Sequence, residues 1–253
     1  MEDQDLRAYV AELLGTFVVV LLTAAAVSAN VRGPLEPWMV VVVALTAGLS
    51  YAAALAFTLP NSSGFLNPAL PIALWVFRQL DGMRALGYIC MQLLGAVLAG
   101  GAIRALFSFP EWISRGNHLG TPHLVEDTLG PDPFGMRVKG IAIELLLTFA
   151  VTLVIFGTVI RRRSLGKTDR FCPLWIGLAV AAATLAGFPM TGAGLNPARW
   201  FGPALWELTI PGSNAFTDHV AYWVGPIGGS LAAAWVYHVF IMPEDGSRKS
   251  IEN

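Results

Sequence analysis

The chain has 253 residues, of which 55% are hydrophobic and 13% charged, with a mean hydropathy of +0.60. Soluble domains carry about 25% charged residues, so this chain has roughly half the charge that a water-facing surface needs. Its 16 Lys and Arg residues nearly cancel its 17 Asp and Glu residues, which leaves no basic surface for nucleic acid. Composition therefore excludes an ordinary soluble enzyme, a disordered regulator and a nucleic-acid binder, and it favours a protein of the lipid bilayer.

Apolar runs of about 18 residues or more predict membrane-spanning helices. Six such segments occur along the chain, the fifth being the shortest: residues 8–29, 38–59, 86–107, 140–160, 173–188 and 220–241. The polar stretch at residues 108–138 predicts an external loop that connects two halves, and residues 242–253 predict a polar tail. We therefore expect a single domain that is an integral part of a membrane.

The basic residues are distributed unevenly between the two sides of the predicted spans. Ten lie on the side of both termini: Arg7, Arg78, Arg84, Arg161, Arg162, Arg163, Lys167, Arg170, Arg248 and Lys249. Five lie on the opposite side: Arg32, Arg104, Arg115, Arg137 and Lys139. Because cytoplasmic loops carry the excess of Lys and Arg, we expect both termini in the cytoplasm and the protein in the plasma (inner) membrane.

The two halves of the chain resemble each other. The sequence at residues 11–19 is AELLGTFVV, and at residues 143–151 it is IELLLTFAV. The tripeptide Asn-Pro-Ala also occurs once in each half, at residues 67–69 and 196–198. Each repeat, 8–107 and 139–241, contains three spans, so the second must be inverted relative to the first. Inverted repeats are typical of transporters and channels, whose sites lie between the repeats near mid-membrane.

Each Asn-Pro-Ala predicts the start of a short helix, at residues 68–79 and 197–207. Asn is a strong N-cap, and Pro suits the first helical turn. At 1.5 Å per residue these helices are ~16–18 Å long, about half of the hydrocarbon core. Entering from opposite faces, they would meet end to end, with unwound loops lining a water-filled path. The predicted fold is an all-α membrane protein with six transmembrane helices and two half-helices in an inverted three-helix repeat.

The predicted meeting point has a definite chemistry. The side-chain amides of Asn67 and Asn196 can donate hydrogen bonds to a passing oxygen atom. Two positive helix-dipole ends repel cations and leave neutral solutes unaffected. Arg199 adds a permanent charge one turn from Asn196, as pores that exclude protons and cations do.

The most specific segments are Asn67-Pro68-Ala69, residues 191–199 with Asn196-Pro197-Ala198, Phe201-Gly202-Pro203-Ala204 and residues 222–226. With them the chain resembles the aquaporin (major intrinsic protein) family over nearly its whole length. The resemblance implies one pore per subunit, homotetramers, and passive conduction without catalysis or a cofactor. It also implies that Glu12 and Glu144 hydrogen-bond the backbone of the half-helix loops.

The resemblance further implies a narrow outer filter at Ala47, Thr184, Ala193 and Arg199. In the strict water channels of this family, the first two positions resemble one another and are Phe and His. In this chain they are the smaller residues Ala47 and Thr184, which predicts a wider filter. A bulky neighbour, either Tyr51 or Phe188, could refill the gap left by Ala47. Ala193 stands where some relatives have a mercury-sensitive cysteine.

Other positions resemble water channels more than glycerol facilitators. They are the aromatic pair Tyr222-Trp223 and the small residue Ala204, whereas Trp200 fits neither group. We therefore predict water conduction, with glycerol, urea or another small neutral solute as the alternative. A secondary transporter is the alternative of a different class.

Further departures from the family pattern are local. Phe65 stands where the family usually has His. Pro71 lacks the N–H that would bond the carbonyl of Asn67, which predicts that this carbonyl faces the pore or another group. The four histidines have no spacing that indicates a metal site, and we expect them in solvent or at the interface: His118, His123, His219 and His238.

Overall fold

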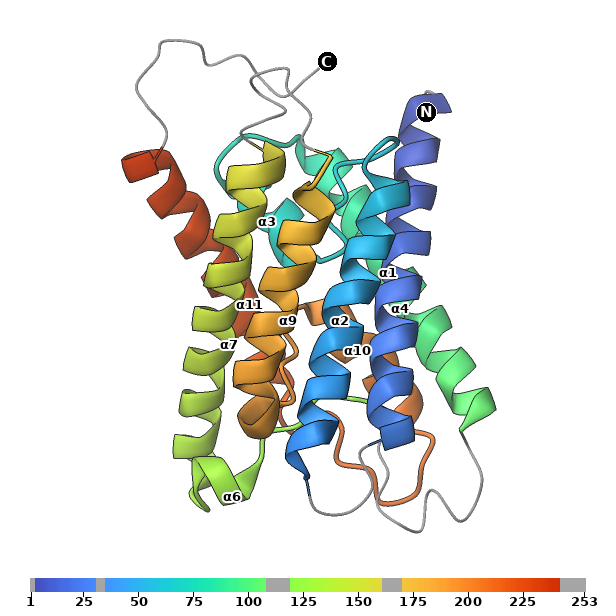
Figure 1. Cartoon of the computed structure of the whole chain (residues 1–253), viewed down its shortest axis with the longest axis vertical. Coiled ribbons are helices and arrows are strands. Elements are labelled where there is room, and N and C mark those ends of the chain that lie inside the picture. The colour runs from blue at the N-terminus through green and yellow to red at the C-terminus, as the bar shows by residue number, and fades with distance from the viewer. Residues whose placement is uncertain (1–2, 31–34, 108–118, 161–169, 242–253) are drawn as a thin grey trace.

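Six long helices lie side by side, and two short helices fill opposite halves of the space between them (Figure 1). The computed structural model describes residues 3–30, 35–107, 119–160 and 170–241. The long helices are α1 (Asp3–Asn30), α2 (Pro37–Thr58), α4 (Gly82–Leu106), α7 (Pro133–Ile155), α9 (Cys172–Thr191) and α11 (His219–Val236). Short π-helical turns extend two of them, η1 (Phe156–Ile160) after α7 and η2 (Tyr237–Ile241) after α11. The short helices are α3 (Ala69–Val76) and α10 (Pro197–Glu207), with a single turn, α6 (Glu126–Leu129), before α7.

All six predicted spans are confirmed as helices long and apolar enough to cross a membrane. Three of them, α1, α4 and α7, begin four or more residues earlier than predicted. Asp81 caps α4 through the amides of Met83 and Arg84, and Asp132 caps α7, where Pro133 occupies the first turn. These Asp caps extend the helices beyond their apolar stretches, so α7 takes in residues that we had predicted to belong to the connecting loop.

Of the two half-helices, α10 has the predicted bounds and α3 is shorter than the predicted 68–79. The helix α3 ends because Arg78 adopts a left-handed conformation with φ 57°. The amide of Gln79 then donates to the carbonyl of Leu74 at 2.8 Å, and that of Arg78 to Trp75 at 2.9 Å. This pattern is a Schellman motif, which usually has Gly at the left-handed position. Because this position is Arg and not Gly, the sequence did not indicate that the helix ends here.

The helices pack in two equivalent sets. In the first, α1 lies against α2 and α4; in the second, α7 lies against α9 and α11. Matching glycines allow the close approach: a Cβ on Gly95 would lie 2.3 Å from the carbonyl oxygen of Leu13, and a Cβ on Gly229 would lie 2.3 Å from that of Leu145. Each half-helix packs on the other set, α10 on α4 and α3 on α11. The inverted repeat is thus confirmed in the packing.

The bundle is apolar outside as well as inside. Leu49, Leu146 and Leu178 are more than half exposed on three different long helices. Several polar side chains are instead buried at the centre, Glu12 and Glu144 among them. This inverted distribution suits a protein whose surroundings are lipid chains, and the chain is an integral membrane protein. The start of α1 and the end of η2 lie at the same end of the bundle (Figure 1). Nine residues discussed above lie outside the described part of the chain: Arg32, Arg115, His118, Arg161, Arg162, Arg163, Lys167, Arg248 and Lys249.

Candidate functional site

The loop before α3 is held by one buried carboxylate. Oε1 of Glu12 accepts hydrogen bonds from the Ser62 hydroxyl and the Phe65 amide, both at 2.9 Å. Its Oε2 accepts from the Leu66 amide at 2.7 Å and from the Gln92 side chain at 2.8 Å. Since Glu12 is fully buried, these four donors take the place of water around the carboxylate.

The loop before α10 repeats the arrangement with Glu144. Oε1 of Glu144 accepts from the Thr191 hydroxyl at 2.6 Å and the Gly194 amide at 2.9 Å, and Oε2 accepts from the Leu195 amide at 2.6 Å. The hydroxyl of Tyr222 also donates to the carbonyl of Thr191 at 2.6 Å. Each glutamate therefore binds two successive backbone amides of the loop in its own half.

These hydrogen bonds hold both loops in a strained conformation. Leu66 and Leu195 have φ values of 53° and 56°, and Ala193 has a φ of 47°. Residues other than Gly rarely occupy this left-handed region, and they persist there only when the surroundings over-determine them. With their amides turned towards the glutamates, the loops direct carbonyl groups to the centre of the bundle.

The two Asn-Pro-Ala segments meet at this centre. Oδ1 of Asn67 accepts from the Ala69 amide at 3.0 Å, and Oδ1 of Asn196 accepts from the Ala198 amide at 2.9 Å, so each side chain caps its own helix. Their amide groups cross over: Nδ2 of Asn67 donates to the Leu195 carbonyl at 2.9 Å, and Nδ2 of Asn196 to the Leu66 carbonyl at 2.7 Å. Each amide has two hydrogens, and the bond across to the opposite loop uses one of them.

The carbonyl of Asn67 follows the second of its two predicted alternatives, a contact with a neighbouring group. It accepts a hydrogen bond from the Leu70 amide at 3.1 Å, whereas the Asn196 carbonyl accepts from Trp200, one residue further along, at 3.2 Å. The first turn of α3 is tighter because Pro71 has no N–H to offer. This carbonyl is therefore used within the helix.

Arg199 and its predicted filter partners are all buried. Ala47 comes from α2 and Thr184 from α9, two helices in direct contact. Ala193 lies against α9, where its Cβ is 3.5 Å from the Cβ position of Gly187, one turn from Thr184. Arg199 is only 4% exposed, yet its Nε and Nη1 have no acceptor among the described residues. A buried guanidinium ordinarily has hydrogen-bond partners for its donors, so these two nitrogens stand out among the groups at the centre.

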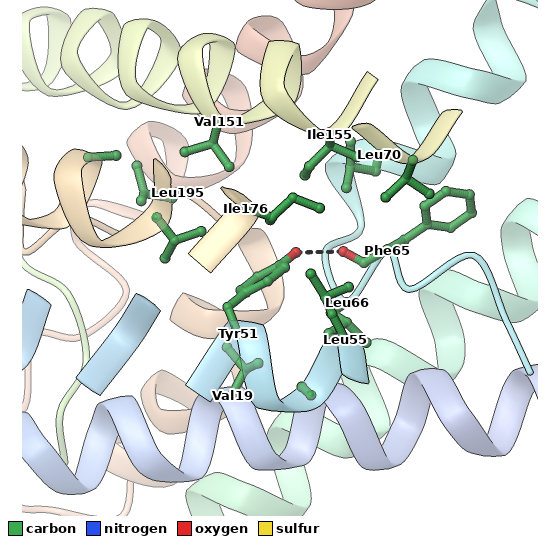
Figure 2. Packing of buried hydrophobic residues seen from close by; sticks show 14 of the residues in the cluster. Val19, Tyr51, Leu55, Phe65, Leu66, Leu70, Val151, Ile155, Ile176 and Leu195 are labelled. Carbon is green, nitrogen blue, oxygen red and sulfur yellow. Dashed lines mark hydrogen bonds between the residues drawn. The ribbon is translucent and has the colours of Figure 1, made fainter. Parts of the chain in front are cut away.

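The two aromatic residues that could refill the filter lie at different levels. Tyr51 follows Ala47 by one turn of α2, and its hydroxyl donates to the Phe65 carbonyl at 2.6 Å (Figure 2). Phe188 follows Thr184 by one turn of α9, near the opposite end of the bundle, and is buried. Tyr51 is therefore one helical turn from Ala47, whose gap it would refill, whereas Phe188 comes from a different helix than Ala47.

The whole architecture has known counterparts. Residues 2–237 match the model of the family described as "Major intrinsic protein". The chain belongs to the major intrinsic protein family. It is 33% identical to probable aquaporin TIP3-2 of Arabidopsis thaliana, covering 94% of this chain and 85% of that protein. It is 36% identical to the lens fiber major intrinsic protein of Oryctolagus cuniculus, with coverages of 94% and 82%. The X-ray structure of the aquaglyceroporin from Plasmodium falciparum matches with a TM-score of 0.79 at 25% identity, over 94% of this chain and 98% of that one.

Membership of this aquaporin family establishes a passive membrane channel. The channel is not an enzyme, and coupled transport is not its mechanism. Which neutral molecules pass is a separate matter, because the named relatives include both aquaporins and an aquaglyceroporin.

Several residues of this channel's centre were missed in the sequence. Ser62, Gln92 and Thr191 bind the buried glutamates. The signal for two of them was the repeat itself, since 129 residues separate Ser62 from Thr191 and also Asn67 from Asn196. Gln92 has no such signal, because its contact depends on how α4 packs against α1.

The prediction for one histidine is wrong. His123 is not solvated: its side chain is 19% exposed, and its Nε2 lies 3.2 Å from Oε1 of the buried Glu207. The loop that carries His123 folds inward, so that His123 lies beside Glu207 of α10 and Pro122 lies beside Gly192, the residue that follows α9. Trp200 is also fully buried, stacked on Tyr222 with ring centroids 5.8 Å apart.

Proposed function

We propose that the chain is a passive water channel whose path runs between the two Asn-Pro-Ala loops. The observation that carries the proposal is the crossed pair of side-chain amides at the meeting point of the half-helices, where Nδ2 of Asn67 donates to the Leu195 carbonyl and Nδ2 of Asn196 to the Leu66 carbonyl. Non-helical backbone at membrane depth is tolerated where it is buried in protein or lines a water-filled cavity. Two such loops that meet at the centre of the bundle support an aqueous path between them.

Cation exclusion follows from the same residues. The N-terminal ends of α3 and α10 converge at Asn67 and Asn196, whose amides bind across to the opposite loop. Both helix dipoles thus present their positive ends to one point. Together with the charge of Arg199, they would repel cations, including hydronium, while a neutral molecule accepts hydrogen bonds from the two amides.

The outer filter supports a second candidate function, facilitation of glycerol, urea or a similar neutral solute. Ala47, Thr184 and Ala193 are all small, and they leave Arg199 as the only large residue of the four. Against this, Tyr222 and Ala204 resemble the residues of water channels. We therefore propose water as the main substrate and passage of small neutral solutes as the alternative.

Orientation and assembly complete the proposal. The excess of basic residues on the side where α1 begins supports cytoplasmic termini in a plasma (inner) membrane. The family resemblance supports a homotetramer with one pore in each subunit. Native mass spectrometry of the purified protein tests this assembly, and labelling of a cysteine placed at either end of α1 in intact cells tests the orientation.

Osmotic shrinkage of vesicles that contain the purified channel tests the function. Water permeability should exceed that of protein-free vesicles, and parallel gradients of glycerol and urea measure the alternative. Ala47→Trp fills the outer filter and should lower the flux, whereas Val41→Trp on the exposed face of α2 should not. Water permeability equal to that of empty vesicles would rule out the proposed channel function.

A further inference from the structure

We infer that Tyr51 forms a second, inner constriction of the pore, and that this residue sets the upper size of the solute. The inference rests on the proposed channel function and adds to it a specificity-determining residue outside the four filter positions. The small residue Ala47 and the bulky residue Tyr51 would both lie on one wall of the same path. A wide outer filter would then lead to a narrow inner one.

The geometry of α2 places Tyr51 on the pore wall. Ala47 and Tyr51 are four residues apart, so they lie on one face of the helix, separated by ~6 Å along its axis. The opposite face of this turn points away from the bundle, since Leu45 and Leu49 are both more than half exposed. If Ala47 borders the path at the outer filter, Tyr51 borders it one turn nearer to the end where α1 begins.

The surroundings of the Tyr51 ring place it at the junction of the two loops. Its hydroxyl donates to the carbonyl of Phe65 at 2.6 Å, and the ring belongs to the same buried cluster as Leu66 and Leu195 (Figure 2). Leu66 and Leu195 are the residues whose carbonyls accept hydrogen bonds from Asn196 and Asn67. The phenol therefore lies beside the point at which the half-helices meet.

The internal repeat argues that Tyr51 is not needed to shape the loop. The separation of 129 residues that relates Asn67 to Asn196 also relates Tyr51 to Val180, and Phe65 to Gly194. Val180 has no hydroxyl and cannot bind the Gly194 carbonyl. The loop before α10 nevertheless adopts the same left-handed conformation, with Leu195 at φ 56° against 53° for Leu66. The aromatic ring is thus present in only one half of the path, and the loop conformation does not depend on it.

The hydrogen bond also changes what a solute meets. The Phe65 carbonyl is one of the loop acceptors available to a molecule in the path, and the Tyr51 hydroxyl now occupies one of its lone pairs. A water molecule can use the second lone pair or the phenol oxygen. A glycerol molecule needs several acceptors in a row and more width, and the ring restricts both. Tyr51 therefore favours water over larger polyols.

The test compares glycerol and water permeability in vesicles for the wild type, Tyr51→Val, Tyr51→Phe and the matched control Leu45→Val. Leu45 lies on the exposed face of the same helix. Tyr51→Val should raise glycerol permeability about tenfold or more, as a barrier lowered by ~1.4 kcal/mol would do. Tyr51→Phe keeps the ring and should keep glycerol excluded, and Leu45→Val should behave as the wild type.

The outcomes distinguish a failure of this inference from a failure of the proposed channel function. Wild-type vesicles that conduct water while Tyr51→Val leaves glycerol permeability unchanged would overturn the constriction, as would a wild type that passes glycerol as readily as water. Absence of water flux in the wild type would instead overturn the proposed function. If size-exclusion chromatography shows that Tyr51→Val is not monodisperse, Tyr51→Leu is measured against the same two criteria.

Discussion

Gly48 of α2 and Gly177 of α9 meet backbone to backbone, related by the same 129 residues that relate the two Asn-Pro-Ala segments. A Cβ on Gly48 would lie 2.4 Å from the Gly177 carbonyl oxygen, and one on Gly177 would lie 2.6 Å from that of Gly48. Since the contact is nearly symmetric, it marks where the twofold axis of the repeat passes between the halves. It also sets how far apart the walls that carry Ala47 and Thr184 can lie.

Gly177→Ala should destabilise the channel by about 1–3 kcal/mol, the usual cost of adding atoms to a close-packed contact. The added methyl group would also approach the Cβ of Ala52, at 2.8 Å. The measurement is the thermal unfolding midpoint in detergent. Gly157→Ala in η1 is the control, because a Cβ there meets nothing within 4 Å. Equal midpoints for the two variants would contradict this account of the contact.

Glu144→Gln should destabilise the loop before α10. Both carboxylate oxygens of Glu144 accept hydrogen bonds, two of them from backbone amides, and a glutamine would oppose one of these donors with its own N–H₂ group. A buried donor without an acceptor costs about 1–3 kcal/mol. The midpoint of unfolding and the water permeability per folded channel should both fall. Glu126→Gln on the exposed turn α6 is the control, and an equally small effect at both positions would refute a bracing role for Glu144.

Arg199→Val should admit protons or small cations, because it removes the permanent charge beside the path and leaves the two helix dipoles alone. A pH-sensitive dye inside vesicles, under an imposed potential, measures the leak. Arg137→Gln, which changes an exposed charge on α7, should leave proton exclusion intact. Unchanged exclusion in Arg199→Val would assign the whole barrier to the dipoles at Asn67 and Asn196.

Thiol reagents should inhibit the wild type little and Ala193→Cys strongly. Ala193 is a predicted filter residue, so a mercurial bound to a cysteine there would obstruct the path. Cys172 is buried, and Cys90 is exposed on α4. Stopped-flow water permeability before and after treatment measures the block. If mercurials leave the water permeability of Ala193→Cys unchanged, the predicted position of Ala193 in the filter is contradicted.

The sequence by itself determined the spans, the inverted repeat and the start of each half-helix. These features depend on local chemistry: apolar runs long enough for a bilayer, and Asn-Pro pairs that cap a helix wherever they occur. The bounds of α10 were predictable for that reason. The end of α3 was not, because Arg78 takes a left-handed conformation that sequence normally signals with Gly.

Only the tertiary structure decided which groups meet. Fifty residues or more separate Glu12 from the donors Ser62 and Gln92, and the hydrogen bond from Asn67 to Leu195 joins the two halves of the chain. The bond from Tyr51 to the Phe65 carbonyl likewise requires α2 and a strained loop to face each other. Such contacts depend on how helices approach, which close glycine pairs such as Gly48 and Gly177 control. The sequence supplies the chemical groups of the pore, whereas the packing of the helices determines the width of the pore.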